Sequence, residues 1–165
     1  MMNRKVKAFT IIELMTTVAI VAVMAAIATP SLRNMILNNR LAAFSNDMIS
    51  SVSAARNEAI STRQSVAVEP NGGDWSDGWL VFVDSNANGS YDNGEEKLKS
   101  VDAYPESLSV NSAPGSNLTF NSKGTMENLG GWGTLKMCDD RGAGRSINVA
   151  GAGIVSVTKI DVGGC

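Results

Sequence analysis

The chain has 165 residues, with 14 Lys and Arg against 16 Asp and Glu, and it contains two Cys and no His. The lack of His excludes catalytic and metal-binding arrangements that need an imidazole. The acidic excess argues against a broad nucleic-acid-binding surface, although it leaves a local basic patch open. A basic leader and a stem of about 50 residues would leave roughly 100 residues, enough for one domain with its own core.

The first element is an apolar stretch, Phe9–Ala28, which follows a basic leader (1–8) and precedes Pro30. Its 20 residues, at a rise of about 1.5 Å each, form a helix of roughly 30 Å, which matches the core of a bilayer. One carboxylate, Glu13, stands near its start, where a charge in lipid costs on the order of 2–3 kcal/mol. The leader is basic through Arg4, Lys5 and Lys7.

Two general interpretations fit this start. A plain transmembrane anchor would keep the basic leader in the cytoplasm under the positive-inside rule. A removable secretory signal would be cut before Thr29, after the A-x-A sequence at 26–28. Glu13, Thr16 and Thr17 argue against the signal, because they fall inside what would be its apolar region.

The segment KAFTIIELMTTVAIVAVMAAIATP (7–30) resembles the N-terminus of type IV prepilins and type II secretion pseudopilins. In that family a prepilin peptidase cuts on the cytoplasmic side of the apolar stretch and methylates the new N-terminus. The resemblance implies a cut between Ala8, which replaces the usual Gly, and Phe9. Counted from this cut, the first, second, fifth and twenty-second residues are Phe9, Thr10, Glu13 and Pro30, in the register of the family.

The resemblance implies a role for these residues in assembly. In the family, the glutamate at the position of Glu13 faces the N-terminal amine of a neighbouring subunit; the alternative is a glutamate that snorkels to the interface. The implied partners are the major pilin and other minor pilins through their stem helices, the prepilin peptidase and the inner-membrane assembly platform. The implied location is the bacterial inner membrane, with a cytoplasmic leader and a periplasmic head, before assembly into a surface pilus.

Helical periodicity continues beyond Pro30, so we expect the proline to kink the helix rather than end it. The expected helix covers 9–63, with a transmembrane part at 9–30 and an amphipathic part at 31–63. Apolar residues recur at mostly three- and four-residue steps, at Leu32, Met35, Ile36, Leu41, Phe44, Met48, Val52, Ala55 and Ile60.

The remainder, 64–165, is predicted to be a β-rich head. Short alternating or apolar runs separated by Gly, Asn, Pro and Ser predict antiparallel strands, in two sheets packed on the upper helix. Trp75, Trp79 and Trp132 are interpreted as core or sheet-edge aromatics. The fold class is α+β, and the resemblance implies the type IV pilin fold. The expected strands are Ser65–Glu69, Trp79–Val83, Glu96–Val101, Leu118–Asn121, Thr134–Met137, Ser146–Val149 and Ile154–Ile160.

The two cysteines, Cys138 and Cys165, lie beyond the membrane stem, in a compartment that should oxidise thiols. Only one pairing is available within the chain, and the alternative is two unpaired thiols. A bridge closing a ring of this size would contribute about 3–4 kcal/mol.

A stretch from Asp84 to Glu95 matches the calcium-loop pattern D-x-N-x-N-G-x5-E. Oxygen ligands from Asp84, Asn86, Asn88, Asp92 and Glu95 could surround one calcium ion. The loop joins two expected strands rather than two helices, however, and Asn and Asp also suit long hairpins. The region around it resembles a hairpin segment of the GspH/FimT family, so no cofactor is expected unless this loop binds calcium.

The C-terminal part, from Cys138 to Ile147, also resembles the GspH/FimT family. One branch of that family contacts DNA through a GRxR motif, and both of its arginines are missing from the corresponding residues, 153–156. Arg141, Arg145 and Lys159 could still form a weak phosphate-binding patch, which neighbouring Asp residues would partly cancel.

No nucleophile elbow, phosphate loop or dinucleotide fingerprint is present, so an enzyme is not expected. The resemblance implies a minor pilin of the GspH/FimT family, most similar to its FimU-type members, at or near the tip of a type IV pilus. It would initiate assembly and connect tip subunits to the major pilin shaft, in motility or adhesion. The alternatives are a minor pseudopilin of type II secretion and a DNA-binding competence pilin.

Overall fold

The computed structural model describes residues 9–114, 117–127 and 132–165. A long helix, α1 (Ile11–Thr62), precedes a series of short strands and two 3-10 turns, η1 (Asn71–Gly73) and η2 (Trp75–Asp77). The described strands are β1 (Val66–Pro70), β2 (Trp79–Val83), β3 (Lys97–Val101), β4 (Leu108–Ser112), β5 (Leu118–Phe120), β6 (Thr134–Asp139), β7 (Gly144–Val149) and β8 (Val155–Ile160).

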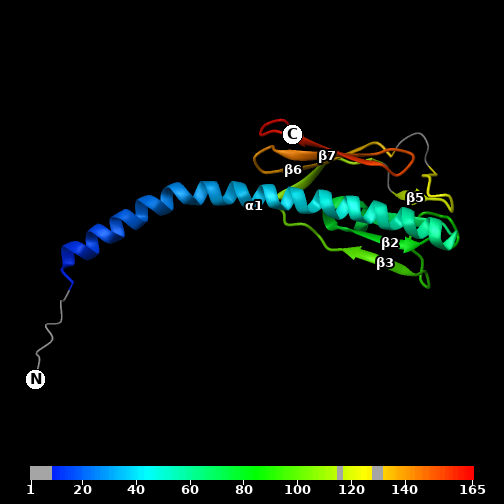
Figure 1. The fold of residues 1–165 in the computed structure, drawn as a ribbon, viewed down its shortest axis with the longest axis horizontal. Helices are drawn as coiled ribbons and strands as arrows, with labels where there is room; N and C mark the ends of the chain where they lie inside the picture. The colour runs from blue at the N-terminus through cyan, green and yellow to red at the C-terminus, as the bar shows by residue number, and fades with distance from the viewer. Residues whose placement is uncertain (1–8, 115–116, 128–131) are drawn as a thin grey trace, which may run out of the picture. The chain divides into compact units, whose positions relative to one another are not determined.

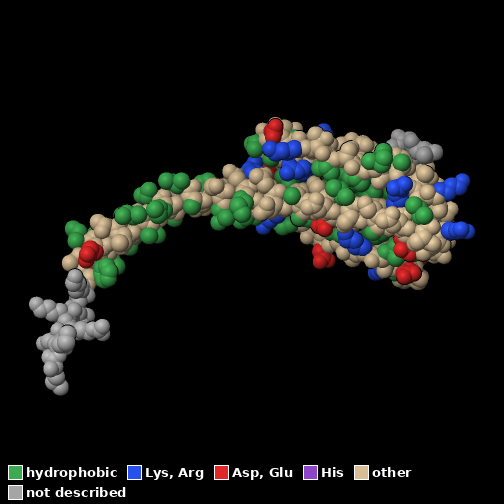
Figure 2. All heavy atoms as spheres, in the orientation of Figure 1, with side chains coloured by type: hydrophobic (Ala, Val, Ile, Leu, Met, Phe, Trp, Pro, Cys, Tyr) green, Lys and Arg blue, Asp and Glu red, His purple; other side chains and the backbone are tan. Residues whose placement is uncertain are grey.

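The chain divides into two compact units, one ending at Asn38 and one running from Asn39 to Cys165. In the first unit, α1 continues through Pro30, as predicted. Its apolar side chains are exposed, and Figure 2 shows them along the stem. This is the helix long and apolar enough to cross a membrane, a criterion that signal sequences also meet.

The second unit is the head, in which the rest of α1 lies alongside two antiparallel four-stranded sheets (Figure 1). One sheet has the order β3-β2-β1-β5 and the other β4-β6-β7-β8. The α+β class and the long helix on antiparallel sheets are as predicted. Strand β4 was not predicted, because its sequence LSVNS is short and polar and buries only Leu108. The helix ends where Arg63 takes a left-handed backbone (φ 57°).

One face of α1 fills the space between the sheets. The buried positions follow the predicted spacing from Leu41 onward and share one core cluster with the sheets; they are Leu41, Phe44, Met48, Val52, Ala55 and Ala59. Before them, Leu32, Met35 and Ile36 are exposed. The predicted position was wrong near the end of α1, where Ala59, rather than Ile60, enters the core. Ile60 instead covers the backbone of Gly124.

The three tryptophans belong to the core, as predicted. Trp75 stacks edge-on against Trp132 with ring centroids 5.0 Å apart, and Trp79 packs edge-on against Phe44 at 5.5 Å. The indole Nε1 of Trp79 donates to the buried hydroxyl of Ser51 at 2.9 Å, which satisfies both polar groups. This aromatic cluster fixes the helix to the sheets.

Candidate functional site

The start of α1 is closed by a reciprocal hydrogen-bonded cap. The backbone N–H and the hydroxyl of Thr10 both donate to Oε2 of Glu13, each at 3.0 Å. The backbone N–H of Glu13 donates to the Thr10 hydroxyl at 3.3 Å. This is a capping box, in which the first residues of a helix satisfy each other's free polar groups. Its signature, Thr-x-x-Glu, is readable in the sequence, and our sequence reasoning missed it.

The capping box leaves part of the Glu13 carboxylate available. Both bonds from Thr10 end on Oε2, and within the described chain no hydrogen bond is made to Oε1. Phe9, which precedes the box, is 84% exposed. Ala8, the other side of the predicted cut, lies outside the described residues. The cap therefore holds a carboxylate at the exposed start of the apolar helix, three residues after Thr10.

The hydroxyl groups inside the apolar segment are satisfied within the helix. Thr16 donates to the carbonyl of Ile12 at 2.9 Å, and Thr29 donates to that of Ala25 at 2.7 Å. Thr17 donates to the carbonyl of Leu14 in the same way. Polar groups paired within their own helix are compatible with a lipid environment. These threonines therefore do not oppose a membrane-spanning role.

The loop between β2 and β3 contains the predicted calcium ligands. The Asp84 carboxylate is buried and accepts the backbone N–H groups of Asn88 at 3.1 Å and Gly89 at 2.8 Å. Gly89 has a φ of 80°, a conformation that glycine adopts without strain. The loop is thus folded around its first carboxylate.

The other predicted ligands extend this network. Asp92 Oδ2 accepts the side-chain amides of Asn86 at 2.7 Å and Asn88 at 2.8 Å. Glu95 accepts the backbone N–H groups of Ser85 and Asp92. Over the described ranges, no three His, Cys, Asp or Glu side chains are grouped to hold a metal. The five residues share one hydrogen-bonded hairpin, and calcium binding stays an alternative hypothesis for this loop.

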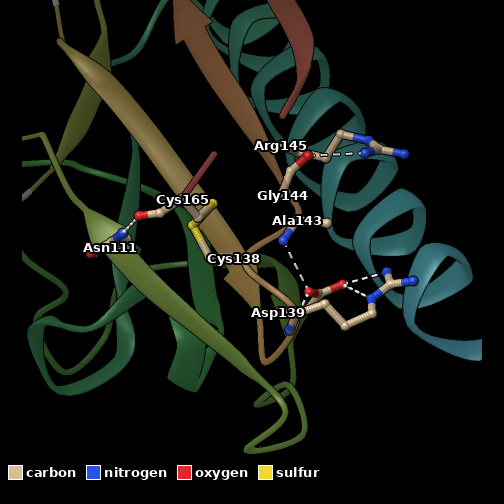
Figure 3. Close-up of a disulfide and its surroundings, with 8 residues drawn as sticks. Asn111, Cys138, Asp139, Ala143, Gly144, Arg145 and Cys165 are labelled. Carbon is tan, nitrogen blue, oxygen red and sulfur yellow. Dashed lines mark hydrogen bonds and ion pairs between the residues drawn. A yellow bond between two sulfur atoms is a disulfide. The ribbon is translucent and has the colours of Figure 1, made fainter. Parts of the chain in front are cut away.

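The predicted disulfide is present and fastens the segment after β8 across the sheet. Cys138 and Cys165 are bonded, with their Cα atoms 6.1 Å apart. Cys165 also donates its N–H to the carbonyl of Gly142 at 3.0 Å and accepts from the side chain of Asn111 at 2.7 Å (Figure 3). Gly144 lies beneath the bridge, where an added Cβ would stand 2.6 Å from the Cys165 sulfur.

The predicted basic residues are brought to one end of this sheet. Arg145 on β7 and Lys159 on β8 are direct cross-strand neighbours. Lys159 pairs with Asp161 at 3.1 Å, and Arg145 donates to the carbonyl of Gly144. Arg141 binds the buried carboxylate of Asp139 at 2.5 Å. Acidic partners thus offset two of the three cations, and DNA binding stays a prediction.

The Asp139 carboxylate organises the turn between β6 and β7. Burial opposes its ionisation, but the guanidinium and backbone N–H of Arg141 and the backbone N–H of Ala143 stabilise the charged form. Together they hold the pKa of Asp139 below its ordinary value.

Family models match both parts of the chain. The model described as type II transport protein GspH matches residues 45–153, and the prokaryotic N-terminal methylation motif matches residues 3–29. The chain belongs to the GspH family. The family match covers most of the head, while the methylation motif covers most of the leader, the capping box and the whole apolar segment.

Solved structures show the same fold as this GspH-family chain. Two crystal forms of the type IV minor pilin FimU from Pseudomonas aeruginosa (strain PAO1) are similar to it. The form in space group P21 has 22% identity and a TM-score of 0.59, and covers 75% of this chain and 92% of FimU. The form in space group P65 has 20% identity and a TM-score of 0.54, with 72% and 92% covered. No curated protein matches the sequence significantly. The predicted type IV pilin fold is confirmed.

Proposed function

We propose that this GspH-family chain is a minor pilin, a structural subunit at or near the tip of a type IV pilus that helps to initiate assembly. The observation that carries the proposal is the N-terminal methylation motif, which coincides with an exposed apolar helix beginning at a capped carboxylate. Such a helix has to be covered by lipid or by other helices, because its apolar side chains are exposed. The fold shared with FimU supports the same role.

In this proposal, a prepilin peptidase removes the leader between Ala8 and Phe9 and methylates Phe9. The chain is held in the inner membrane by the first part of α1, with the head in the periplasm. The assembly platform then transfers it into the filament, where its stem packs against those of the major pilin and other minor pilins. Its action is structural, without catalysis.

Glu13 has a defined part in this process. The capping box uses Oε2 and keeps the carboxylate in one orientation, so that Oε1 can accept the N-terminal amine of a neighbouring subunit. A positive partner would offset the cost of a carboxylate in lipid. Thr10 supports this role by orienting Glu13. Pro30 lacks a backbone N–H and leaves the carbonyl of Ala26 without its usual donor inside the apolar segment.

Two substitutions separate the charge of Glu13 from its capping role. Glu13→Gln keeps a side chain that serves in a capping box but removes the charge, whereas Glu13→Ala removes both. Both variants should be cleaved and held in the membrane. We expect each to reduce recovery of the subunit in sheared filaments about tenfold or more, as for loss of a hydrogen bond between charged groups.

Quantitative immunoblotting of sheared filaments and of membranes measures this effect. Thr10→Ser, which keeps the capping hydroxyl, is the matched control and should assemble normally. Normal assembly of Glu13→Gln would show that only helix capping matters and would contradict the proposed contact with a neighbour's amine.

The matching family is described as type II transport protein GspH, which favours a second candidate, a minor pseudopilin of type II secretion. Its stem would act in the same way, in a short periplasmic filament that exports folded proteins. Deletion of the chain would then abolish secretion without affecting surface pili. A competence role would require DNA binding at low salt that Arg145→Ala and Lys159→Ala abolish.

A further inference from the structure

The two sheets of the head have four edge strands among the described residues: β3 and β5 in one sheet, β4 and β8 in the other. An edge strand presents unpaired backbone N–H and C=O groups that can pair with another chain. Proteins usually prevent this by short edges, lysines, bulges or a covering segment.

Three of the four edges carry such a feature. Strand β3 contains Lys97 and Lys99 and pairs with β2 through a register shift. The pairing of β4 also shifts, after Val110. Strand β5 has only three residues, and Met126 forms a bridge with Phe120. These edges are poor templates for an added strand.

Strand β8 is different. Its six residues pair with β7 in unbroken register, from Val155 opposite Val149 to Ile160 opposite Gly144. It contains one charged side chain, Lys159, and within the described part of the chain no strand pairs with its other side. It is therefore the longest regular edge of the head.

The hairpin between β7 and β8 shows which backbone groups face outward. The N–H of Ala150 donates to the carbonyl of Ile154 at 2.9 Å, so these two residues are a hydrogen-bonded pair. In an antiparallel ladder such pairs recur at every second residue. The N–H and C=O groups of the intervening residues, Val155, Val157 and Lys159, therefore point away from β7 along the free edge.

Apolar side chains accompany this edge. Val157 is 37% exposed, and Ile154 and Val162, which flank the strand, are 65% and 70% exposed. At the other end of the strand, Lys159 lies opposite Arg145 and pairs with Asp161 at 3.1 Å. Arg145 donates to the carbonyl of Gly144 and has no ion pair within the described part of the chain. A complementary strand would have alternating apolar residues and an acidic residue near Arg145.

We propose that the free edge of β8 is a docking site for an extended segment in the head of a neighbouring filament subunit, which pairs with β8 as an added strand. Main-chain hydrogen bonds to Val155, Val157 and Lys159 give the affinity, and the apolar side chains and Arg145 set the register. The inference rests on the proposed function, because it requires a subunit that assembles with others.

A pair of proline variants tests the site. Val157→Pro removes a backbone N–H that faces outward, and proline is tolerated on an edge strand in that position. Thr158→Pro removes an N–H bonded to β7 and should destabilise the head. Val157→Ala keeps the outward N–H and controls for loss of the side chain.

We expect Val157→Pro to melt close to the wild type in detergent, yet to be recovered in sheared filaments about fivefold less, as for loss of one hydrogen bond. Val157→Ala should be recovered nearly normally.

Hydrogen exchange of the wild type gives a second measurement that does not depend on a variant folding. In the purified full chain, the amides of Val155, Val157 and Lys159 should exchange fast, and in filaments they should be protected. Fast exchange in filaments, or normal incorporation of a folded Val157→Pro variant, overturns the docking site and leaves the minor-pilin proposal intact. Absence of the wild type from every filament overturns the proposed function and this inference with it.

Discussion

At the turn between β6 and β7, a single buried carboxylate connects the fold to the pH of its surroundings. Asp139 is only 6% exposed and is held ionised by the side chain and backbone of Arg141 and by the backbone of Ala143. Its pKa in the folded state is lower than its ordinary value. Because the unfolded chain binds the proton more tightly, the stabilisation is complete above the unfolded pKa, about 3.9. It is lost as the pH falls through the folded pKa.

We therefore expect the free energy of unfolding of the wild type to fall as the pH is lowered below about 4. Asp139→Asn should cost about 2–3 kcal/mol at pH 7, because Arg141 loses its buried partner, and should show a weaker dependence on pH. Urea unfolding between pH 3 and 7 measures both effects. The control is Asp161→Asn, whose exposed pair with Lys159 should contribute less than about 1 kcal/mol. If the free energy of unfolding depended on pH equally in the wild type and in Asp139→Asn, this account would be contradicted.

Some side-chain contacts could be predicted from the sequence and others could not. The role of Ser51 depends on Trp79, a distant residue that only the folded chain brings close, so no local pattern predicts it. Asp139 has local partners, Arg141 and Ala143, but its burial depends on the fold. The cap formed by Thr10 and Glu13 is local, and a Thr-x-x-Glu pattern was there to be read. The disulfide between Cys138 and Cys165 was predictable because the chain holds just two cysteines.

At the scale of elements, the loop between β2 and β3 offers a test of cation binding. Asp84 is buried and accepts two backbone N–H groups. Asp84→Ala should therefore destabilise the head by about 2–3 kcal/mol. Asp92→Ala should cost less, since Asp92 is exposed and accepts from side chains.

The same proteins can be melted with calcium and with a chelator. We expect equal melting temperatures, because the carboxylates of the loop already have hydrogen-bond donors. A rise in melting temperature with calcium that Glu95→Gln removes would contradict this expectation and establish the calcium site.

Periodicity in the sequence predicted most of the helices and strands. It failed where tertiary packing determines whether a strand forms or a residue is buried. The helix was expected at 9–63 and runs from Ile11 to Thr62. Seven strands were expected, and each has an observed counterpart. Strand β4 was missed because its partner β6, rather than its own sequence, holds it in place. Ala59 is in the core and Ile60 is exposed, because the helix position that faces the sheets is set by packing. A list of apolar residues cannot show which of two neighbours takes that position.

For the whole molecule, the sequence predicted two sheets on a helix but not the order of the strands. That order depends on pairings between distant segments, such as β1 with β5 and β4 with β6, and many orders fit the same alternation. The free edge of β8 follows from this order and so could not be foreseen. In contrast, the N-terminal segment is local in sequence, so its resemblance to the family motif was identifiable without knowledge of the fold.

The most direct test of the minor-pilin proposal is mass spectrometry of the N-terminal peptide of this chain, in sheared filaments and in membranes. The proposal predicts a methylated peptide that begins at Phe9, present in the filaments. A chain that begins at Thr29 would be a secreted protein without a stem, and an unprocessed chain found only in the membrane would be a plain anchor. Either result would contradict assembly into a pilus.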